Sequence, residues 1–181
     1  RLCNSGVRWL KTPPPGRSLK EMWDELREGA ALFSELLNAD VPHKAIENPV
    51  MHRYAKELIE NFVPAAQSVQ PWEFATEEDG PDNVKKRTCF WLNGLPKLRK
   101  TGTLDGATAR AEIHLAAPGP QRSVERSRFF PAMAAAIADQ WGQAALAYKG
   151  RDVPSLAKQK QAQKPTYETT FGLPLFRRRC R

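Results

Sequence analysis

The chain has 181 residues, a formal net charge of +8 and a sequence pI near 9.6. Its length allows one domain with a hydrophobic core, and its hydrophobic fraction of 41% is that of a globular protein. The three cysteines lie far apart without a CxxC pair, which excludes a disulfide framework. No apolar run reaches the roughly 18 residues that a membrane span needs.

These totals predict a reduced, cytoplasmic protein with a polyanionic partner. The sequence contains neither paired cysteines nor a signal peptide, which favours an intracellular location. The excess of Lys and Arg favours nucleic acid as the partner. The alternative is a solvated basic end of the chain, because several arginines crowd there: Arg177, Arg178, Arg179 and Arg181.

The first long element is predicted to be a helix. Residues 1–17 form a loop, one apolar turn and a proline-rich linker. Ser18 and Glu21 have the spacing of a capping box, so a helix is expected from there to about Asn38. Its apolar residues recur at spacings of three and four, which gives one face for a core: Leu19, Met22, Trp23, Leu26, Ala30, Phe33 and Leu37.

Short strands and helices then alternate. A strand is expected over residues 41–47, a helix over 52–61, an edge strand over 68–74, a surface loop over 75–84 and a strand over 87–92. A helix followed by a strand is half of a βαβ unit, so the sheet is expected to be mostly parallel, with flanking helices.

The last third of the chain is divided into a connection, a helix and a tail. Residues 94–122 are rich in Gly, Pro and Thr and predict a long irregular connection. A helix is expected over residues 131–148, with Pro131 in its first turn. The sequence therefore predicts an α/β domain over residues 1–149 and a basic, largely disordered tail over residues 150–181.

The candidate site begins at the end of the first strand. Glu47 and Asn48 follow a short apolar run and precede Pro49, which stops a strand. A carboxylate at a strand end can accept a hydrogen bond from the amino group of a base such as cytosine. The alternative is structural: Glu47 caps the next helix or pairs with Lys44, and Asn48 sets a turn.

Two pairs of cations precede the predicted strand over residues 87–92 and the last predicted helix. Lys86 and Arg87 precede an apolar strand, and Arg126 and Arg128 are two residues apart, so on an extended segment both would face one way. Two guanidinium groups on one side suit phosphate or carboxylate. The alternatives are charges that flank a strand to prevent aggregation, and pairing with Glu125 or the acidic loop.

Other kinds of site have weak support. The histidines have no ligand spacing, so no metal site is expected: His43, His52 and His114. The chain contains neither a GxGxxG motif nor a P-loop. A lone thiol such as Cys3 can be a nucleophile, but is more often inert.

Five segments stand in one order along about residues 1–142: Asn4-Ser5-Gly6-Val7-Arg8-Trp9, Ile46-Glu47-Asn48-Pro49-Val50-Met51-His52, Val69-Gln70-Pro71-Trp72-Glu73-Phe74, Lys86-Arg87-Thr88-Cys89-Phe90-Trp91-Leu92 and Glu125-Arg126-Ser127-Arg128-Phe129-Phe130-Pro131. In that order they resemble a family of small phage and prophage proteins described as DNA cytosine methyltransferase-like. The resemblance implies a phage or bacterial host cell and DNA as the partner.

The resemblance also implies roles taken from the larger cytosine-5 methyltransferases. There a Pro-Cys motif attacks carbon 6 of cytosine, and a Glu-Asn-Val motif binds the ring. Glu47 and Asn48 match the Glu-Asn pair, with Pro49 in place of valine. Lys86 and Arg87 lie where an arginine-bearing strand is expected, although the Gln-x-Arg-x-Arg pattern is not met.

By this comparison the catalytic residues would be Glu47, Asn48 and Arg87. The nucleic-acid-binding residues would be Lys86, Arg126 and Arg128. Phe130 and Pro131 resemble the closing segment of the fold, near the pocket for the methyl donor S-adenosylmethionine. These assignments are implied by the resemblance and form the expected site.

The chain also departs from that family. The Pro-Cys motif and the donor-binding strands would stand before Arg1, Cys3 does not match the nucleophile position, and the acidic loop 75–84 is longer. The resemblance therefore implies a partial Rossmann-like methyltransferase fold, incomplete at its N-terminus and inactive by itself.

The expected function is that of a DNA cytosine-5 methyltransferase-like protein, which in its intact form transfers the methyl group to a cytosine flipped out of the duplex. One alternative is a non-catalytic nucleic-acid-binding or phage-associated structural protein. Another is a different base- or nucleotide-modifying enzyme that keeps Glu47 as the ring-binding acid.

Overall fold

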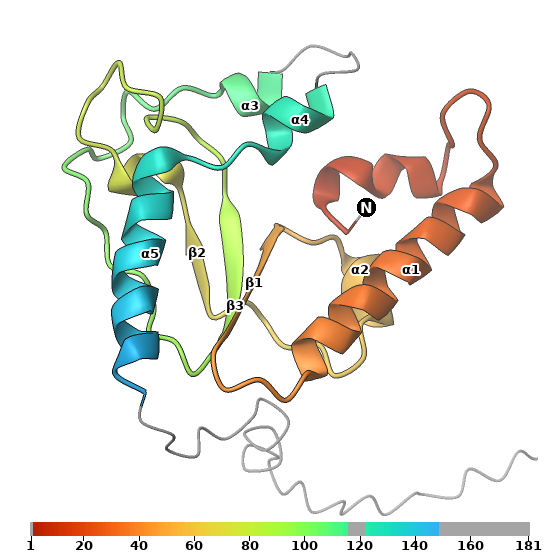
Figure 1. Ribbon diagram of the computed structural model, residues 1–181. Coiled ribbons are helices and arrows are strands. Elements are labelled where there is room, and N and C mark those ends of the chain that lie inside the picture. The colour runs from red at the N-terminus through yellow and green to blue at the C-terminus, as the bar shows by residue number, and fades with distance from the viewer. Residues whose placement is uncertain (1, 116–121, 149–181) are drawn as a thin grey trace, which may run out of the picture.

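A three-stranded antiparallel sheet lies between helices in the computed structural model, which describes residues 2–115 and 122–148 (Figure 1). The strands are β1 (Lys44–Pro49), β2 (Gln67–Val69) and β3 (Thr88–Asn93), and their order in the sheet is β1-β3-β2. β3 is the central strand and runs antiparallel to both neighbours.

The sequence-based prediction of a mostly parallel, Rossmann-like sheet is wrong. β1 and β2 run in the same direction and are joined through a helix, which is the alternation that suggested parallel pairing. They are not adjacent, however, because β3 lies between them. β3 follows β2 through a segment of loop and 3₁₀ helix that returns the chain in the opposite direction, so each pair in the sheet is antiparallel.

The first long helix, α1 (Leu19–Asn38), begins where the sequence predicts. Ser18 accepts a hydrogen bond from the backbone N–H of Glu21 at 3.2 Å, and the Glu21 carboxylate accepts one from the N–H of Ser18 at 2.6 Å. These two bonds complete the capping box. The next helix, α2 (Arg53–Leu58), is shorter than expected, and the His52 ring caps it by accepting from the N–H of Ala55.

One hydrophobic core fills the space between α1, α2 and one face of the sheet. Ile46 of β1 and Trp91 of β3 lie opposite each other in register and both point into this core. The Phe33 ring of α1 meets the Trp91 ring edge-on, with centroids 5.0 Å apart. Leu37 is completely buried there, so the apolar face of α1 packs on the sheet as its periodicity predicts.

A second core lies on the other face, under α5 (Pro131–Leu146). Because successive side chains of a strand alternate between faces, Phe90 points away from its neighbour Trp91. The Phe90 ring meets Trp141 of α5 with centroids 5.2 Å apart. The carboxylate of Asp82 accepts from the N–H of Ala132 at 3.0 Å, so the acidic loop binds the first turn of α5.

The remaining elements are short. They are the 3₁₀ helices η1 (Asn4–Leu10) and η2 (Pro71–Phe74) and the helices α3 (Glu112–Leu115) and α4 (Arg122–Ser127). The strand predicted over residues 68–74 is thus divided into β2 and η2, because Pro71 begins a helical turn. The expected irregular connection is interrupted by α3. The tail predicted over residues 150–181 lies outside the described residues.

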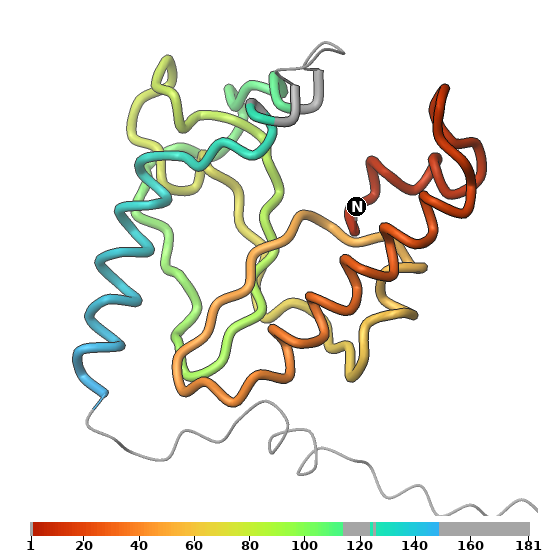
Figure 2. Tube along the Cα trace, turned by 45° about the vertical axis from the view of Figure 1, so that its right-hand side comes forward, coloured from red at the N-terminus to blue at the C-terminus, as the bar shows by residue number. Residues whose placement is uncertain are grey.

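The start of the chain lies beside the end of β1 (Figures 1 and 2). The N–H of Asn4 donates to the carbonyl of Val50 at 3.0 Å, and the N–H of His52 donates to the carbonyl of Leu2 at 3.2 Å. Leu2 is buried in the core under α1. These contacts place η1 next to the last residues of β1.

The fold predicts a large difference between two leucine truncations. Leu37→Ala removes a side chain with no exposed surface and should lower the free energy of unfolding by about 2–5 kcal/mol. Leu146→Ala, at a position 83% exposed, should change it by less than about 0.5 kcal/mol. Chemical denaturation of both variants measures this difference, and equal losses would contradict the packing of α1 on the sheet.

Candidate functional site

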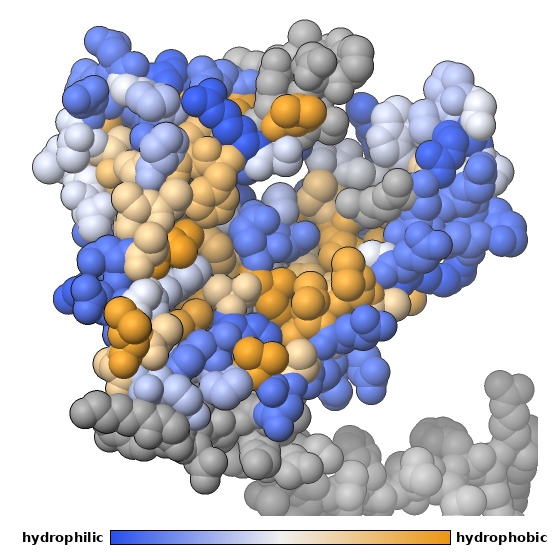
Figure 3. Space-filling view, in the orientation of Figure 1, coloured by the Kyte–Doolittle hydropathy of each residue, from blue (hydrophilic) through white to orange (hydrophobic). Residues whose placement is uncertain are grey.

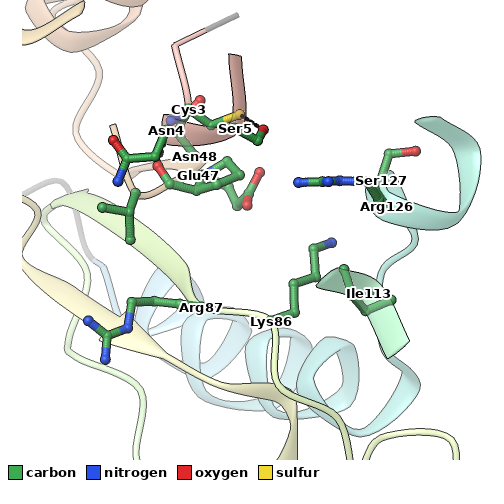
Figure 4. A pocket seen from close by; sticks show the side chains of 12 residues that line it. Cys3, Asn4, Ser5, Glu47, Asn48, Lys86, Arg87, Ile113, Arg126 and Ser127 are labelled. Atoms are coloured by element: carbon green, nitrogen blue, oxygen red, sulfur yellow. Dashed lines mark hydrogen bonds between the residues drawn. The ribbon is translucent and has the colours of Figure 1, made fainter. Parts of the chain in front are cut away.

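A cleft of about 710 Å³ opens where four parts of the chain meet: the start of the chain, the end of β1, the segment before β3, and the helices α3 and α4 (Figure 4). Its charged residues come from three separate segments: Glu47 from β1, Lys86 and Arg87 from the segment before β3, and Arg126 from α4. Only the tertiary fold brings them together. Its lining residues are Cys3, Asn4, Ser5, Glu47, Asn48, Pro49, Val50, Lys86, Arg87, Ile113, Arg126 and Ser127.

Glu47 lies within β1, which continues to Pro49, two residues beyond the expected end of the strand at Glu47. Ile46 points into the core, so the next side chain along the strand points to the opposite face and into the cleft. The carboxylate is exposed in surface area, yet it lies in a concave site where protein replaces part of its hydration. This burial raises the pKa of Glu47, and the nearby charge of Lys86 opposes the rise.

Lys86 enters the cleft from the segment before β3. Its Nζ donates to the backbone carbonyl of Arg128 at 2.7 Å and lies 5.6 Å from the centroid of the Phe130 ring. Partial burial lowers the pKa of Lys86, the charge of Glu47 opposes this, and the charge of Arg126 lowers it further. Lys86 is thus held in place by the chain that leads into α5.

Arg126 approaches Glu47 from the other side of the cleft (Figure 4). The sequence-based expectation that Arg126 and Arg128 share one face of an extended segment is wrong. Arg126 lies in the last turn of α4, and Arg128 follows that helix. Arg128 therefore takes part through its carbonyl, and its exposed side chain does not line the cleft.

The Glu47 carboxylate faces the two cations across open space. Within the described ranges 2–115 and 122–148, it forms neither a hydrogen bond nor an ion pair at contact distance. Its interaction with Lys86 acts at longer range, since the ammonium group is already bonded to a carbonyl. A carboxylate in this position can bind a ligand that carries hydrogen-bond donors, while the cations bind its negative groups.

Asn48 and Arg87 also line the cleft, but less directly. The Asn48 side-chain amide donates to the carbonyl of Pro49 at 2.7 Å, which fixes the end of β1. Arg87 is exposed, and its guanidinium points away from Glu47 (Figure 4). The expected catalytic set of Glu47, Asn48 and Arg87 is therefore gathered at one cleft, with only the glutamate facing its centre.

Phe130 and Pro131 lie outside the lining of the cleft. Phe130 is 1% exposed and belongs to the core under α5. Pro131 begins α5 and is exposed to solvent. The Phe130 ring contacts the cleft through Lys86 alone, so a residue expected to touch a methyl donor instead supports a cation.

The sequence did not single out the start of the chain as part of the site. Cys3, Asn4 and Ser5 line the cleft, and the thiol of Cys3 lies 2.9 Å from the hydroxyl of Ser5. Burial is the largest single influence on this thiol and raises its pKa. The hydrogen bond with the Ser5 side chain, the charge of the N-terminal amino group and hydrogen bonds with the backbone of Ser5 and Gly6 together outweigh burial, so the pKa of Cys3 is lowered. The signals in the sequence were the lone thiol of Cys3 in a polar run and the resemblance carried by the segment that begins at Asn4.

In the part of the chain that the structure describes, no three His, Cys, Asp or Glu side chains are gathered as metal ligands. Of the helices in the same residues, none combines the length and the apolar character that a membrane span requires.

Comparison of the chain with protein-family models, with curated proteins and with solved structures gave no match. The assignment of a function therefore depends on the geometry of the cleft and on the order of the five segments named above.

The raised pKa of Glu47 predicts a pH-dependent effect of Glu47→Gln. In the folded state Glu47 binds its proton more tightly than in the unfolded chain, where a glutamate has its ordinary pKa of 4.5. The ionised side chain therefore lowers the stability as the pH rises above that value. The variant should gain stability relative to the native chain between about pH 4 and about pH 7.

Urea denaturation at the two pH values measures this gain. Glu35→Gln, at an exposed position of α1 outside the cleft, is the matched control and should show no such change. A difference between Glu47→Gln and the native chain that is the same at both pH values would contradict the burial of Glu47.

Proposed function

We propose that the cleft holds one cytosine of a DNA strand, as the base-binding part of a protein related to cytosine-5 methyltransferases. Glu47 contacts the ring, and Lys86 and Arg126 contact the phosphates that flank it. The observation that carries this proposal is the convergence of segments far apart in the sequence. Four of the five segments that carry the family resemblance contribute lining residues to this one cleft.

The chemistry of the cleft suits a nucleotide. Its volume lies within the range of about 300–1,000 Å³ that is usual for small-molecule sites. An ionised carboxylate accepts from the exocyclic amino group of cytosine, and a protonated one donates to a ring nitrogen. The raised pKa of Glu47 favours the second role, because it increases the protonated fraction near neutral pH.

The two cations supply the part of binding that is independent of base sequence. Phosphate contacts position a nucleic acid and give most of its salt-dependent affinity. Lys86 and Arg126 stand on the side of the cleft opposite Glu47, so a nucleotide can place its base on one side and its phosphate on the other. The net charge of +8 supports the same partner.

A base inside a duplex cannot enter such a cleft. Enzymes that act on a base take it out of the stack or use a single strand. Glu47 lies on a strand at the side of a concave site, so a stacked base would be kept away by its own helix. The preferred ligand is therefore a single-stranded or flipped cytosine.

The described residues do not fit the methyl donor, S-adenosylmethionine, at the expected place. Phe130 is covered by the core and offers no face to a ligand, and the exposed Pro131 lies outside the cleft. We therefore assign no step of methyl transfer to these residues. This misfit favours, as a second candidate, a DNA-binding protein without catalysis that uses the same cleft.

Binding of single-stranded oligonucleotides tests the proposed function. Lys86→Ala and Arg126→Ala should weaken binding and should each reduce the salt dependence, log Kd against log salt, by about 0.7. Glu47→Gln should change the affinity for a cytosine-containing strand more than that for a strand of thymine alone, whose bases have no exocyclic amino group.

Fluorescence anisotropy at several salt concentrations measures both effects. Arg53→Ala, which removes an exposed cation at the start of α2 that does not line the cleft, is the control. If Arg53→Ala weakens binding as much as Arg126→Ala, general basic charge explains the affinity, and the cleft is not the binding site.

A separate titration with S-adenosylmethionine distinguishes a methyltransferase from a DNA-binding protein without catalysis. Because Phe130 and Pro131 form no open pocket, the chain should release no measurable heat with the donor in isothermal calorimetry. Saturable binding of the donor, accompanied by labelling of cytosine with its methyl group, would contradict this expectation and favour methyl transfer.

A further inference from the structure

Among the described residues, no strand pairs with the outer edge of β1. β3 pairs with β1 along its whole length, from Lys44 to Pro49, and the sheet order leaves β1 at one edge. In the described part of the chain, the pairing with residues 2–4 begins only beyond this strand, at Val50. An edge strand presents unpaired backbone N–H and C=O groups, which a further strand can bind.

An apolar groove runs along this edge between β1 and α1. Leu32 and Leu36 are 59% and 44% exposed and stand four residues apart on one face of α1. Figure 3 shows hydrophobic surface gathered over this part of α1. The groove has a volume of about 530 Å³, and its other lining residues are Leu2, Glu25, Glu28, Gly29, Phe33, Ile46, Glu47 and Asn48.

The C-terminal residues have the pattern of a strand that fits an edge. Phe171, Leu173 and Leu175 alternate with Gly172 and Pro174, after two threonines. Alternate residues of a strand share one face and one side of hydrogen bonding. If the backbone N–H and C=O groups of these three apolar residues face β1, the backbone nitrogen of Pro174 faces solvent. A missing N–H is tolerated there because no strand pairs on that side.

This segment can reach the groove. The last described residue, Tyr148, packs its ring edge-on against the ring of His43, with centroids 4.4 Å apart. His43 directly precedes Lys44, the first residue of β1. Residues 149–168 then separate Tyr148 from Thr169 and can span about 65 Å when extended. The length of β1 is about 20 Å, so the connection imposes no strain.

The spacing and charge of the C-terminal segment also match those of the groove-lining residues of α1. Leu36, Leu32 and Glu28 follow one another along α1 in steps of four residues, about 6 Å each. Leu173, Leu175 and Arg177 follow one another in steps of two residues, about 6.6 Å each in a strand. The chain leaves α1 and turns into β1 at the Leu36 end of the groove, so a strand running along β1 in the same direction meets these partners in order (Figure 1).

We propose that residues 169–177 bind the edge of β1 as a fourth strand, with Leu173 on Leu36, Leu175 on Leu32 and Arg177 near Glu28. The interaction covers the exposed leucines and removes an edge that could pair with other chains. Glu47 and Asn48 line both this groove and the cleft. The proposal does not depend on the proposed function.

Amide hydrogen exchange of the full chain tests this strand. In Leu173→Asp/Leu175→Asp, the outward-facing amides of β1 should exchange about tenfold faster or more, because two carboxylates cannot be buried against the leucines of α1. Amides of α5 should keep their native rates, which shows that the fold is intact. Ala157→Asp/Ala162→Asp adds the same charge to the tail and should leave β1 unchanged.

A charge exchange gives a second readout. Glu28→Arg should speed exchange of the β1 amides, and Arg177→Glu in the same chain should restore the native rates. Equal exchange in the native chain and in the Leu173→Asp/Leu175→Asp variant would overturn the proposal. Protection that grows with protein concentration would also overturn it, because the edge would then bind a second copy of the chain.

Discussion

The pairing of β3 with both other strands is the constraint on which the rest of the structure depends. Because β3 is central, its side chains must alternate between two cores, and Phe90 and Trp91 therefore point to opposite helices. The same strand fixes β1 in register along six residues, which decides that Ile46 is buried and that Glu47 faces out. The position of the site thus follows from the packing of a single strand.

The electrostatics of the cleft follow from this arrangement. The carboxylate is carried by β1, whereas Lys86 comes from the segment before β3 and Arg126 from α4. The backbone of Arg128 binds Lys86 and keeps it from closing onto Glu47. Each charged group is partly desolvated, so burial raises the pKa of Glu47 and lowers the pKa of Lys86. A ligand with an amino-bearing ring and a phosphate would satisfy both.

The sequence predicted the parts of the fold that local rules govern. The capping box at Ser18 was correct, and so was the apolar stripe of α1 apart from Leu19, which is exposed in the first turn. Capping and helical periodicity depend on neighbours a few residues away. The prediction of parallel strand pairing was wrong, since nothing local in β1 or β2 indicates which strand lies between them. The extended segment predicted for Arg126 was also wrong, because α4 places it in a helical turn.

The sequence by itself determined the residue types of the candidate site: a Glu-Asn pair before a proline and cations in two distant segments. It also determined which faces of the helices are apolar. Only the tertiary structure decided that Cys3 joins this site, that Arg87 turns away from it and that Phe130 is buried behind it. The physical reason is that alternation and periodicity fix the direction of a side chain within its own element, whereas a site between elements depends on how long-range packing orders the strands.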